Sequence, residues 1–235
     1  MKEGRNSKVY GKNMPSWLKA VLFALICTLL IVILKECVSG DANASADKVL
    51  LAKNEAWNQK VIDSCISLLK DGDMVIRTGR DITSQMLCRF NQQDQTYSHC
   101  GIVSIENGYP YVYHSIGGED NPDAKLRRDS ASFWFSTVHN LGLGICRFDM
   151  SDESLIKLKQ VVRQYYKERK MFDMSFDLNS DDRLYCAEFV YKAVNKTMND
   201  NTYLQPVTRF GLEYVAIDNL YMNEHTDVIC QVRYK

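Results

Sequence analysis

Apolar and polar positions along the chain follow two spacings, one typical of helices and one typical of strands. Residues 54–73 place apolar side chains at helical spacing and end at an Asp-Gly pair, which predicts a helix. Residues 74–79 form a short apolar run that predicts a strand. A second, shorter helix is expected next, with Thr83 or Ser84 as its N-cap. The first part of the chain therefore mixes both element types.

The stretch HCGIVSIENGYPYVYHS contains two β-rich runs separated by Asn107-Gly108. Asn-Gly is the strongest two-residue signal for a β-hairpin. If these two residues form the turn, His99 and His114 project from the same face as diagonal neighbours, because side chains alternate along a strand. A slip of one residue would move His114 to the other face. The turn therefore predicts that the two imidazoles lie close enough to touch.

The segment after the hairpin, residues 117–130, is polar and is expected to be irregular. Two strands and two helices are expected in the remainder: strands over 141–150 and 225–235, one helix over 151–170 capped by Ser151, and one helix capped by Asp181 or Asp182 and running through Val194. Residues 172–182 form a polar and aromatic loop before the last of these helices. The sequence contains no internal repeat and no Gly-rich phosphate loop.

The N-terminal part has the pattern of a membrane-targeting segment. Lysine and arginine residues precede the uncharged apolar run VLFALICTLLIVIL. The expected organisation has four parts: a basic region over 1–16, a signal-anchor or signal-peptide helix over 17–34, a tether over 35–52 and one globular domain over 53–235. A retained anchor is favoured over cleavage, with a single pass through the inner or cytoplasmic membrane. The positive flank then stays in the cytoplasm and the domain faces the periplasm or the exterior; cleavage would make the domain a secreted one.

Composition and charge narrow the classes of function. The chain has 235 residues, of which 46% are hydrophobic and 25% are charged, which is enough for one full domain and too little for two. The net charge is zero, but the first forty residues hold six Lys/Arg against two Glu, so the remainder carries about −4. A negatively charged domain argues against nucleic acid as a partner.

The eight cysteines do not form a recognisable framework. Their spacing is irregular, and the sequence has neither a C-x-x-C pair nor a metal-ligand pattern. One cysteine, Cys27, lies in the apolar segment, and five others lie in apolar runs where a thiol commonly acts as a small core residue: Cys65, Cys88, Cys100, Cys146 and Cys230. The sequence thus allows one disulfide but does not predict a network.

Cys186 and the two histidines are the candidates for chemistry. Cys186 would lie in the opening turn of its helix, where the macrodipole and free backbone amides favour the thiolate. One imidazole would act as its general base and the other would orient the base. Structural alternatives remain open, because Cys186 also fits a core cysteine and His99 a structural histidine at a strand end. A zinc site built from these residues would lack a fourth ligand.

Four other polar residues lie outside this group. Asp120 and Asp123 could orient a base, but the loop that carries them has no predictable path. His139 and His225 lie in polar surroundings and are expected at the surface.

Four ordered blocks, DGDMVIRTG, YSHCGIV, YVYHS and FDMSFDLNSDDRLYCAEFVYKA, resemble the YiiX/YebB-like branch of the NlpC-type cysteine hydrolases over roughly residues 70–195. The resemblance implies an α+β fold of the circularly permuted papain type, with an antiparallel sheet packed against helices. It implies that Cys186 is the nucleophile and His99 its base. The third polar residue of that family, often glutamate, would fall where this chain has His114, and lecithin:retinol acyltransferase-like relatives can carry histidine there.

Three functions follow from these observations. The leading one is a cysteine hydrolase without a cofactor that forms an acyl-enzyme on an amide bond, for example a cell-wall peptide bond. The second is a lipid acyltransferase or thioesterase of the lecithin:retinol acyltransferase-like type, which a membrane anchor at residues 17–34 would favour. The third is a ligand-binding module that has lost catalysis. The sequence identifies neither the substrate nor the oligomeric state.

Overall fold

The structure, a computed structural model, describes residues 28, 48–118, 121–209 and 211–235. The chain divides into residues 1–53 and a second unit over residues 54–235. The predicted basic region and all of the predicted apolar segment except Thr28 lie outside the described residues. Residues 48–52, which were expected to belong to an irregular tether, are helical. Among the helices that the structure describes, none is both long and apolar enough to cross a membrane.

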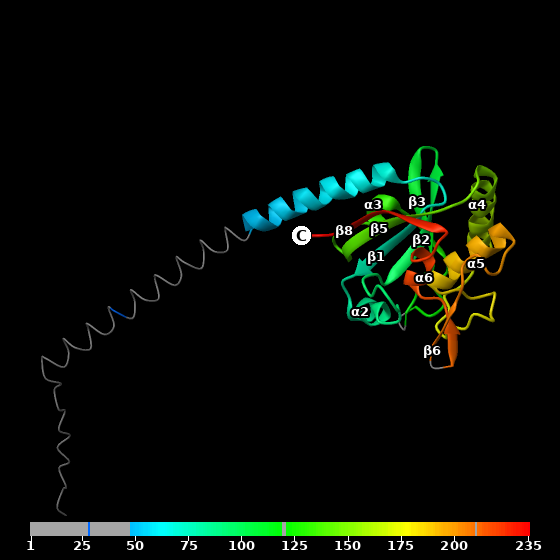
Figure 1. Cartoon of the computed structure of the whole chain (residues 1–235). Coiled ribbons are helices and arrows are strands. Elements are labelled where there is room, and N and C mark those ends of the chain that lie inside the picture. Colours follow the sequence, from blue (N-terminus) through cyan, green and yellow to red (C-terminus); the bar gives the residue numbers. More distant parts are fainter. Residues whose placement is uncertain (1–27, 29–47, 119–120, 210) are drawn as a thin grey trace, which may run out of the picture. The chain divides into compact units, whose positions relative to one another are not determined.

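A six-stranded antiparallel sheet forms the centre of the second unit (Figure 1). Its spatial order is β4-β3-β2-β1-β5-β8. The strands are β1 (Met74–Gly79), β2 (His99–Glu106), β3 (Tyr109–His114), β4 (Arg127–Ser130), β5 (Asn140–Phe148) and β8 (Thr226–Arg233). A separate two-stranded ribbon consists of β6 (Val207–Arg209) and β7 (Leu212–Tyr214). The unit is thus an α+β fold in which an antiparallel sheet packs against helices.

Strand β1 lies between β2 and β5, and its sequence explains that place. Met74, Val75 and Ile76 have no exposed surface, so consecutive side chains are buried on opposite faces of the sheet. A strand that is apolar on both faces is stable only where both faces are covered. Burying each such side chain stabilises the fold by roughly 1.5–3 kcal/mol.

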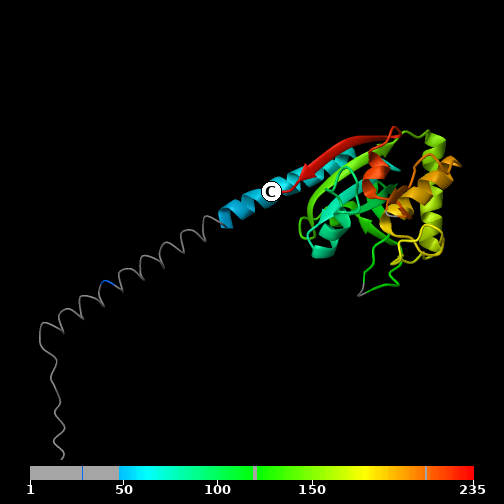
Figure 2. The same ribbon diagram turned by 60° about the horizontal axis from the view of Figure 1, so that its bottom comes forward.

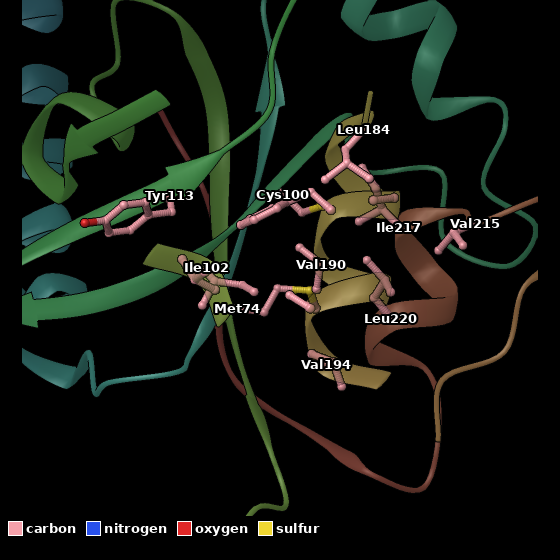
Figure 3. Close-up of a cluster of buried hydrophobic side chains, with 14 of the residues drawn as sticks. Met74, Cys100, Ile102, Tyr113, Leu184, Val190, Val194, Val215, Ile217 and Leu220 are labelled. Atoms are coloured by element: carbon pink, nitrogen blue, oxygen red, sulfur yellow. The ribbon is translucent and has the colours of Figure 1, made fainter. Parts of the chain in front are cut away.

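One face of the sheet is covered by three helices from the second half of the chain. These are α4 (Asp152–Lys167), α5 (Cys186–Met198) and α6 (Ile217–Tyr221). In the close-up of this core, Cys100 and Ile102 of β2 point toward Val190 and Val194 of α5 (Figure 3). Helices α4 and α5 lie side by side in both views of the ribbon (Figures 1 and 2). Packing against β2 therefore fixes the position of α5.

The other face is covered by residues 54–68, which are helical, and by the short helix α3 (Ala131–Trp134). Ile62 and Cys65 from the first of these, and Trp134 from the second, pack against Val75 and Val103 of the sheet. The helical spacing of apolar residues in the sequence correctly indicates this packing. The face of the sheet that carries His99 is thus closed by Trp134.

The hairpin has the register that the Asn-Gly turn predicts. Glu106 pairs with Tyr109, and the pairing continues without a shift as far as Ile102 and Tyr113. The two turn residues adopt left-handed backbone conformations, with φ of 51° at Asn107 and 85° at Gly108. This is the type of turn whose twist matches the twist of paired strands. The prediction of the register is confirmed.

Two other local expectations were wrong. Helix α2 (Ile82–Cys88) is capped by Asp81, whose carboxylate accepts a hydrogen bond from the Ser84 N–H at 2.8 Å, and not by Thr83 or Ser84. Part of the segment expected to be irregular forms β4, which pairs with β3. The short run Arg-Arg-Asp-Ser has no apolar residue, so its strand pairing left no hydrophobic signal in the sequence.

Replacing Gly108 by alanine tests how strongly the turn is specified. A Cβ atom at Gly108 would meet no described atom within 4 Å, so the substitution strains only the left-handed backbone. We expect the free energy of unfolding to fall by about 1 kcal/mol, measured by urea denaturation. Gly118→Ala is the matched control, since its Cβ is equally free among the described residues and its φ is not positive. Equal losses in the two variants would contradict a role for the left-handed turn.

Candidate functional site

The hairpin brings His99 and His114 into direct contact. Nε2 of His99 lies 3.0 Å from Nδ1 of His114, and the two rings meet edge to face with centroids 5.1 Å apart. Both imidazoles also contact the ring of Trp134, at centroid distances of 5.0 and 4.5 Å. His99 is 7% exposed and His114 is 1% exposed. The predicted pair therefore exists as a buried, hydrogen-bonded unit.

Asp129 extends this pair and was missed in the sequence. Its Oδ2 lies 3.0 Å from Nε2 of His114, and the same carboxylate forms an ion pair with Arg127 at 2.8 Å. It occupies β4, where Val112 of β3 is its partner in the ladder. Only the pairing of β4 with β3 puts this carboxylate beside the imidazole. The three side chains are hydrogen-bonded in the order Asp129, His114, His99.

The hydrogen bonds fix which nitrogen carries each proton. His114 and Arg127 hold the pKa of the Asp129 carboxyl below its usual value, so the carboxylate can only accept. Nε2 of His114 is then the N–H donor, and its Nδ1 accepts from Nε2–H of a neutral His99. Nδ1 of His99 is left with a free lone pair. This arrangement makes Nδ1 of His99 the basic end of the chain.

Burial keeps both imidazoles neutral. It lowers the pKa of His114 to about 4, against the opposing hydrogen bond to Asp129. Burial and the nearby Arg77 guanidinium also lower the pKa of His99 well below its usual value. A neutral His99 is the form that can accept a proton.

Cys186 is the first residue of α5, closer to the helix N-terminus than the sequence predicts. Tyr185 is the N-cap residue, and its backbone N–H donates to the Glu188 carboxylate at 3.1 Å. The predicted caps, Asp181 and Asp182, lie outside the helix. The segment before the helix is held extended by pairing of residue 171 with residue 183, which overrides their capping preference.

The thiol of Cys186 is half-buried and its surroundings favour the thiolate. Its pKa is lowered by a hydrogen bond with the Cys100 thiol and, against the effect of burial, by the backbone amides of Cys100, Ala187 and Cys186 itself. Free amides at a helix N-terminus are expected to stabilise negative charge in this way. The expected electrostatic effect of the helix start is thus present.

Two contacts join Cys186 to the histidine hairpin. Cys100, whose thiol contacts that of Cys186, follows His99 directly in β2. Ser115, which follows His114, donates a hydrogen bond of 2.5 Å to the carbonyl of Leu184. Cys186, His99, His114 and Asp129 all line one cleft of about 1480 Å³. The four side chains therefore line one cleft from three separate parts of the chain. The Cys186 thiol contacts Cys100, whose side chain projects from the face of β2 opposite to that of His99.

The remaining polar candidates do not join this group. Asp123 forms an exposed ion pair with Arg183 at 2.8 Å, and Asp120 lies outside the described residues. His139 is exposed at the cleft, whereas His225 is only partly exposed and stacks on Tyr203. The prediction of a surface position is confirmed for His139 and only in part for His225.

The other cysteines behave mainly as core residues. Cys88, Cys100 and Cys146 are buried free thiols. Cys65 and Cys230 are also unbonded, although their sulfur atoms approach to 3.2 Å. The described residues therefore contain no disulfide.

Neutral buried imidazoles predict a pH-dependent stability. Unfolded His114 gains a proton below a pKa of about 6.5, while the folded residue does so only near pH 4. Stability is therefore full above pH 6.5 and falls as the pH decreases toward 4. We expect a loss of about 2 kcal/mol between pH 7 and pH 5 from this residue, and His114→Gln should remove that loss in urea denaturation.

Glu188 acts in the opposite direction, because burial raises its pKa to about 7 and its contribution to stability grows as the pH falls. It is present in both proteins, so the difference between wild type and variant isolates the histidine. An unchanged pH dependence in His114→Gln would show that the imidazole is already charged in the fold.

No protein-family model matches the chain. It is 28% identical over 129 residues to the uncharacterized protein YiiX of Escherichia coli strain K12, an alignment that covers 54% of this chain and 58% of the relative. The chain thus matches less than two thirds of the length of that curated relative. The crystal structure of the metalloprotein YiiX from Escherichia coli O157:H7 superimposes with a TM-score of 0.57 at 20% identity, covering 70% of this chain and 98% of that one. The chain is therefore similar to YiiX in sequence and has a similar fold.

Proposed function

We propose that the protein is a cysteine hydrolase that acts on an acyl bond through a covalent acyl-enzyme. The observation that supports this most strongly is the hydrogen-bonded chain from Asp129 through His114 to His99, in one cleft with a thiol at a helix N-terminus. A nucleophile, a base and a group that orients the base are the parts of a catalytic triad. Here His114 orients His99, and the Asp129 carboxylate in turn orients His114.

The proposed reaction begins with proton transfer from Sγ of Cys186 to Nδ1 of His99. The thiolate then attacks the carbonyl carbon, and the backbone N–H of Cys186 is the candidate donor to the oxyanion. Collapse of the adduct breaks the bond to the leaving group, which takes the proton from His99. Water, deprotonated by His99, attacks the thioester and releases the acid, and the proton returns to the thiol.

The arrangement of elements supports the permuted papain-like type. The histidine strand precedes the cysteine helix in the chain, and the helix packs on an antiparallel sheet through β2. His114 takes the orienting place that a carboxylate or amide takes in related sites. We therefore extend the resemblance to NlpC-type hydrolases from sequence blocks to the roles of Cys186, His99 and His114.

A second candidate substrate class is an apolar acyl chain. Several large apolar side chains that line the cleft are between 37% and 70% exposed: Phe90, Phe133, Met174, Phe176 and Leu212. Clustered exposed apolar side chains mark binding surfaces. This supports thioesterase or acyltransferase activity as an alternative to amide hydrolysis, and comparing turnover of a long-chain acyl thioester with that of an acyl amide separates the two.

The solved YiiX is described as a metalloprotein, so we tested whether the residues here fit a metal. Among the described residues, no group of three or more His, Cys, Asp or Glu side chains is arranged to hold an ion. Nε2 of His99 and both ring nitrogens of His114 are engaged in the hydrogen-bonded chain. This donor set does not fit a metal, and the proposed steps do not involve one.

The N-terminal sequence supports a location at a membrane. The basic flank and apolar run at residues 17–34 would hold the domain at a membrane, outside the cytoplasm. A reporter fused after Lys235 that is active only in the cytoplasm would contradict this topology.

Alkylation at about pH 6 tests the proposed nucleophile, because an ordinary thiol with a pKa of about 8.5 hardly reacts there. We expect iodoacetamide to label Cys186, with Cys186→Ser abolishing that label. His99→Ala should slow labelling at neutral pH and recover in part at alkaline pH. Asp129→Asn should slow labelling at neutral pH about tenfold or more, because it disturbs the tautomer and orientation of His114. Mass spectrometry of digested protein measures each site.

Cys230→Ser is the matched control. Cys230 is also partly exposed, and its pKa is lowered by its contact with the Cys65 thiol, but it lies outside the cleft. This variant should keep full labelling of Cys186. If Cys186→Ser unfolds the protein while Cys100 or Cys146 takes the probe, Cys186 is a core residue. An unreactive Cys186 in a folded protein would instead support a non-catalytic binding module.

A further inference from the structure

Arg77 places a positive charge directly beside the histidine pair. It lies on β1 opposite His99 in the strand ladder, and paired residues project from the same face of a sheet. Its guanidinium lies over the ring of Trp134, 4.3 Å from the centroid. It lines the same cleft as Cys186 and His99. The guanidinium is therefore held at the edge of the proposed reaction centre.

This cation has no anionic partner among the described residues. Its Nε atom is buried and has no hydrogen-bond partner, and no described carboxylate lies within ion-pair distance of it. Asp129 and Asp81 act on Arg77 electrostatically, but both carboxylates are already engaged. Asp129 binds His114 and Arg127, and Asp81 caps α2 through Ser84. Burial lowers the pKa of Arg77 to about 10, against the opposing electrostatic effects of Asp129, Cys186 and Asp81.

A buried charge without a partner is costly, whereas the same charge facing a ligand can provide specificity. The planar guanidinium donates two parallel hydrogen bonds to a carboxylate or phosphate. Trp134 covers one face of the guanidinium, while Arg77 as a whole stays partly exposed and lines the cleft. Arg77 can thus donate hydrogen bonds to an anionic group in the cleft that Cys186 also lines.

We propose that Arg77 binds an anionic oxygen group of the substrate, a carboxylate or a phosphate, adjacent to the bond that Cys186 attacks. This inference rests on the proposed function. It adds that the substrate carries a negative charge next to the bond that is broken. An N-acylated amino acid or peptide with a free carboxylate next to the scissile bond has this chemistry, and so does an acyl ester that carries a phosphate. An uncharged acyl amide would be a poorer substrate.

Two alkylating reagents that differ only in charge test the proposal on the full-length protein. Iodoacetate and iodoacetamide react in the same way: the thiolate forms a C–S bond and iodide leaves. We expect Cys186 to prefer iodoacetate about tenfold or more, relative to the ratio that free N-acetylcysteine shows, with rates that saturate. Arg77→Met should lower the ratio of the two rates at Cys186 to the ratio that free N-acetylcysteine shows.

Two further variants keep the result interpretable. Arg77→Lys retains the charge and should keep part of the preference, and Arg233→Met removes an exposed cation outside the cleft and should keep all of it. Methionine fills a similar volume without a charge, so Arg77→Met should fold with a thermal midpoint no lower than wild type. A preference that persists in Arg77→Met would overturn the proposal. Equal falls in both rates, with their ratio unchanged, would show that Arg77 acts on the thiolate and would also overturn the proposal.

Protection experiments identify the source of the anion. N-acetylglycine and inorganic phosphate are each tested against iodoacetate, with uncharged N-acetylglycinamide as the matched control. Protection by either anion, lost in Arg77→Met, supports the proposal and names the group; protection by neither overturns it. If Cys186 reacts with neither reagent, the proposed hydrolase function fails. Anion binding is then measured by the shift in thermal midpoint with N-acetylglycine or phosphate, and its absence in wild type overturns the present inference separately.

Discussion

The hydrogen bond between Nε2 of His99 and Nδ1 of His114 is the contact on which the rest of the site depends. It exists only in one register of the β2-β3 hairpin, because a slip of one residue would turn His114 to the opposite face. The left-handed backbone at Asn107 and Gly108 sets that register some distance from the imidazoles. The conformation of the turn thereby determines the orientation of His99, the candidate catalytic base.

Charged and polar groups around the His99–His114 pair determine the protonation states of the two imidazoles and of Cys186. The Asp129 carboxylate accepts from His114, which fixes the proton positions and leaves Nδ1 of His99 basic. Trp134 packs against both rings, and Arg77 on the same face disfavours the protonation of His99. The amides at the start of α5 favour a negative Cys186. A neutral His99 can take the proton of the thiol, and the stabilised thiolate can then attack an acyl carbon.

Sequence patterns predict the local parts of this arrangement and miss those that depend on distant pairing. The hairpin, the helix over 54–68 and α4 follow from turn chemistry and apolar spacing within one segment. Asp129 was missed because β4 has no apolar alternation and becomes a strand only by pairing with β3. The start of α5 was misplaced because an extended pairing at residue 183 overrides the capping preference of Asp181 and Asp182. The sequence does not single out Arg77, because the lack of a hydrogen-bond partner for its buried Nε atom is visible only in the structure.

The ionisation state of Cys186 tests the central claim most directly. Thiolate absorbs in the ultraviolet, so a pH titration of the difference between wild type and Cys186→Ser reports this one sulfur atom. We predict that the thiolate appears well below the ordinary thiol pKa of about 8.5, and that His99→Ala changes its titration. A difference spectrum without thiolate until clearly above that pH would show that the cleft does not activate Cys186 and would contradict the assignment of a nucleophile.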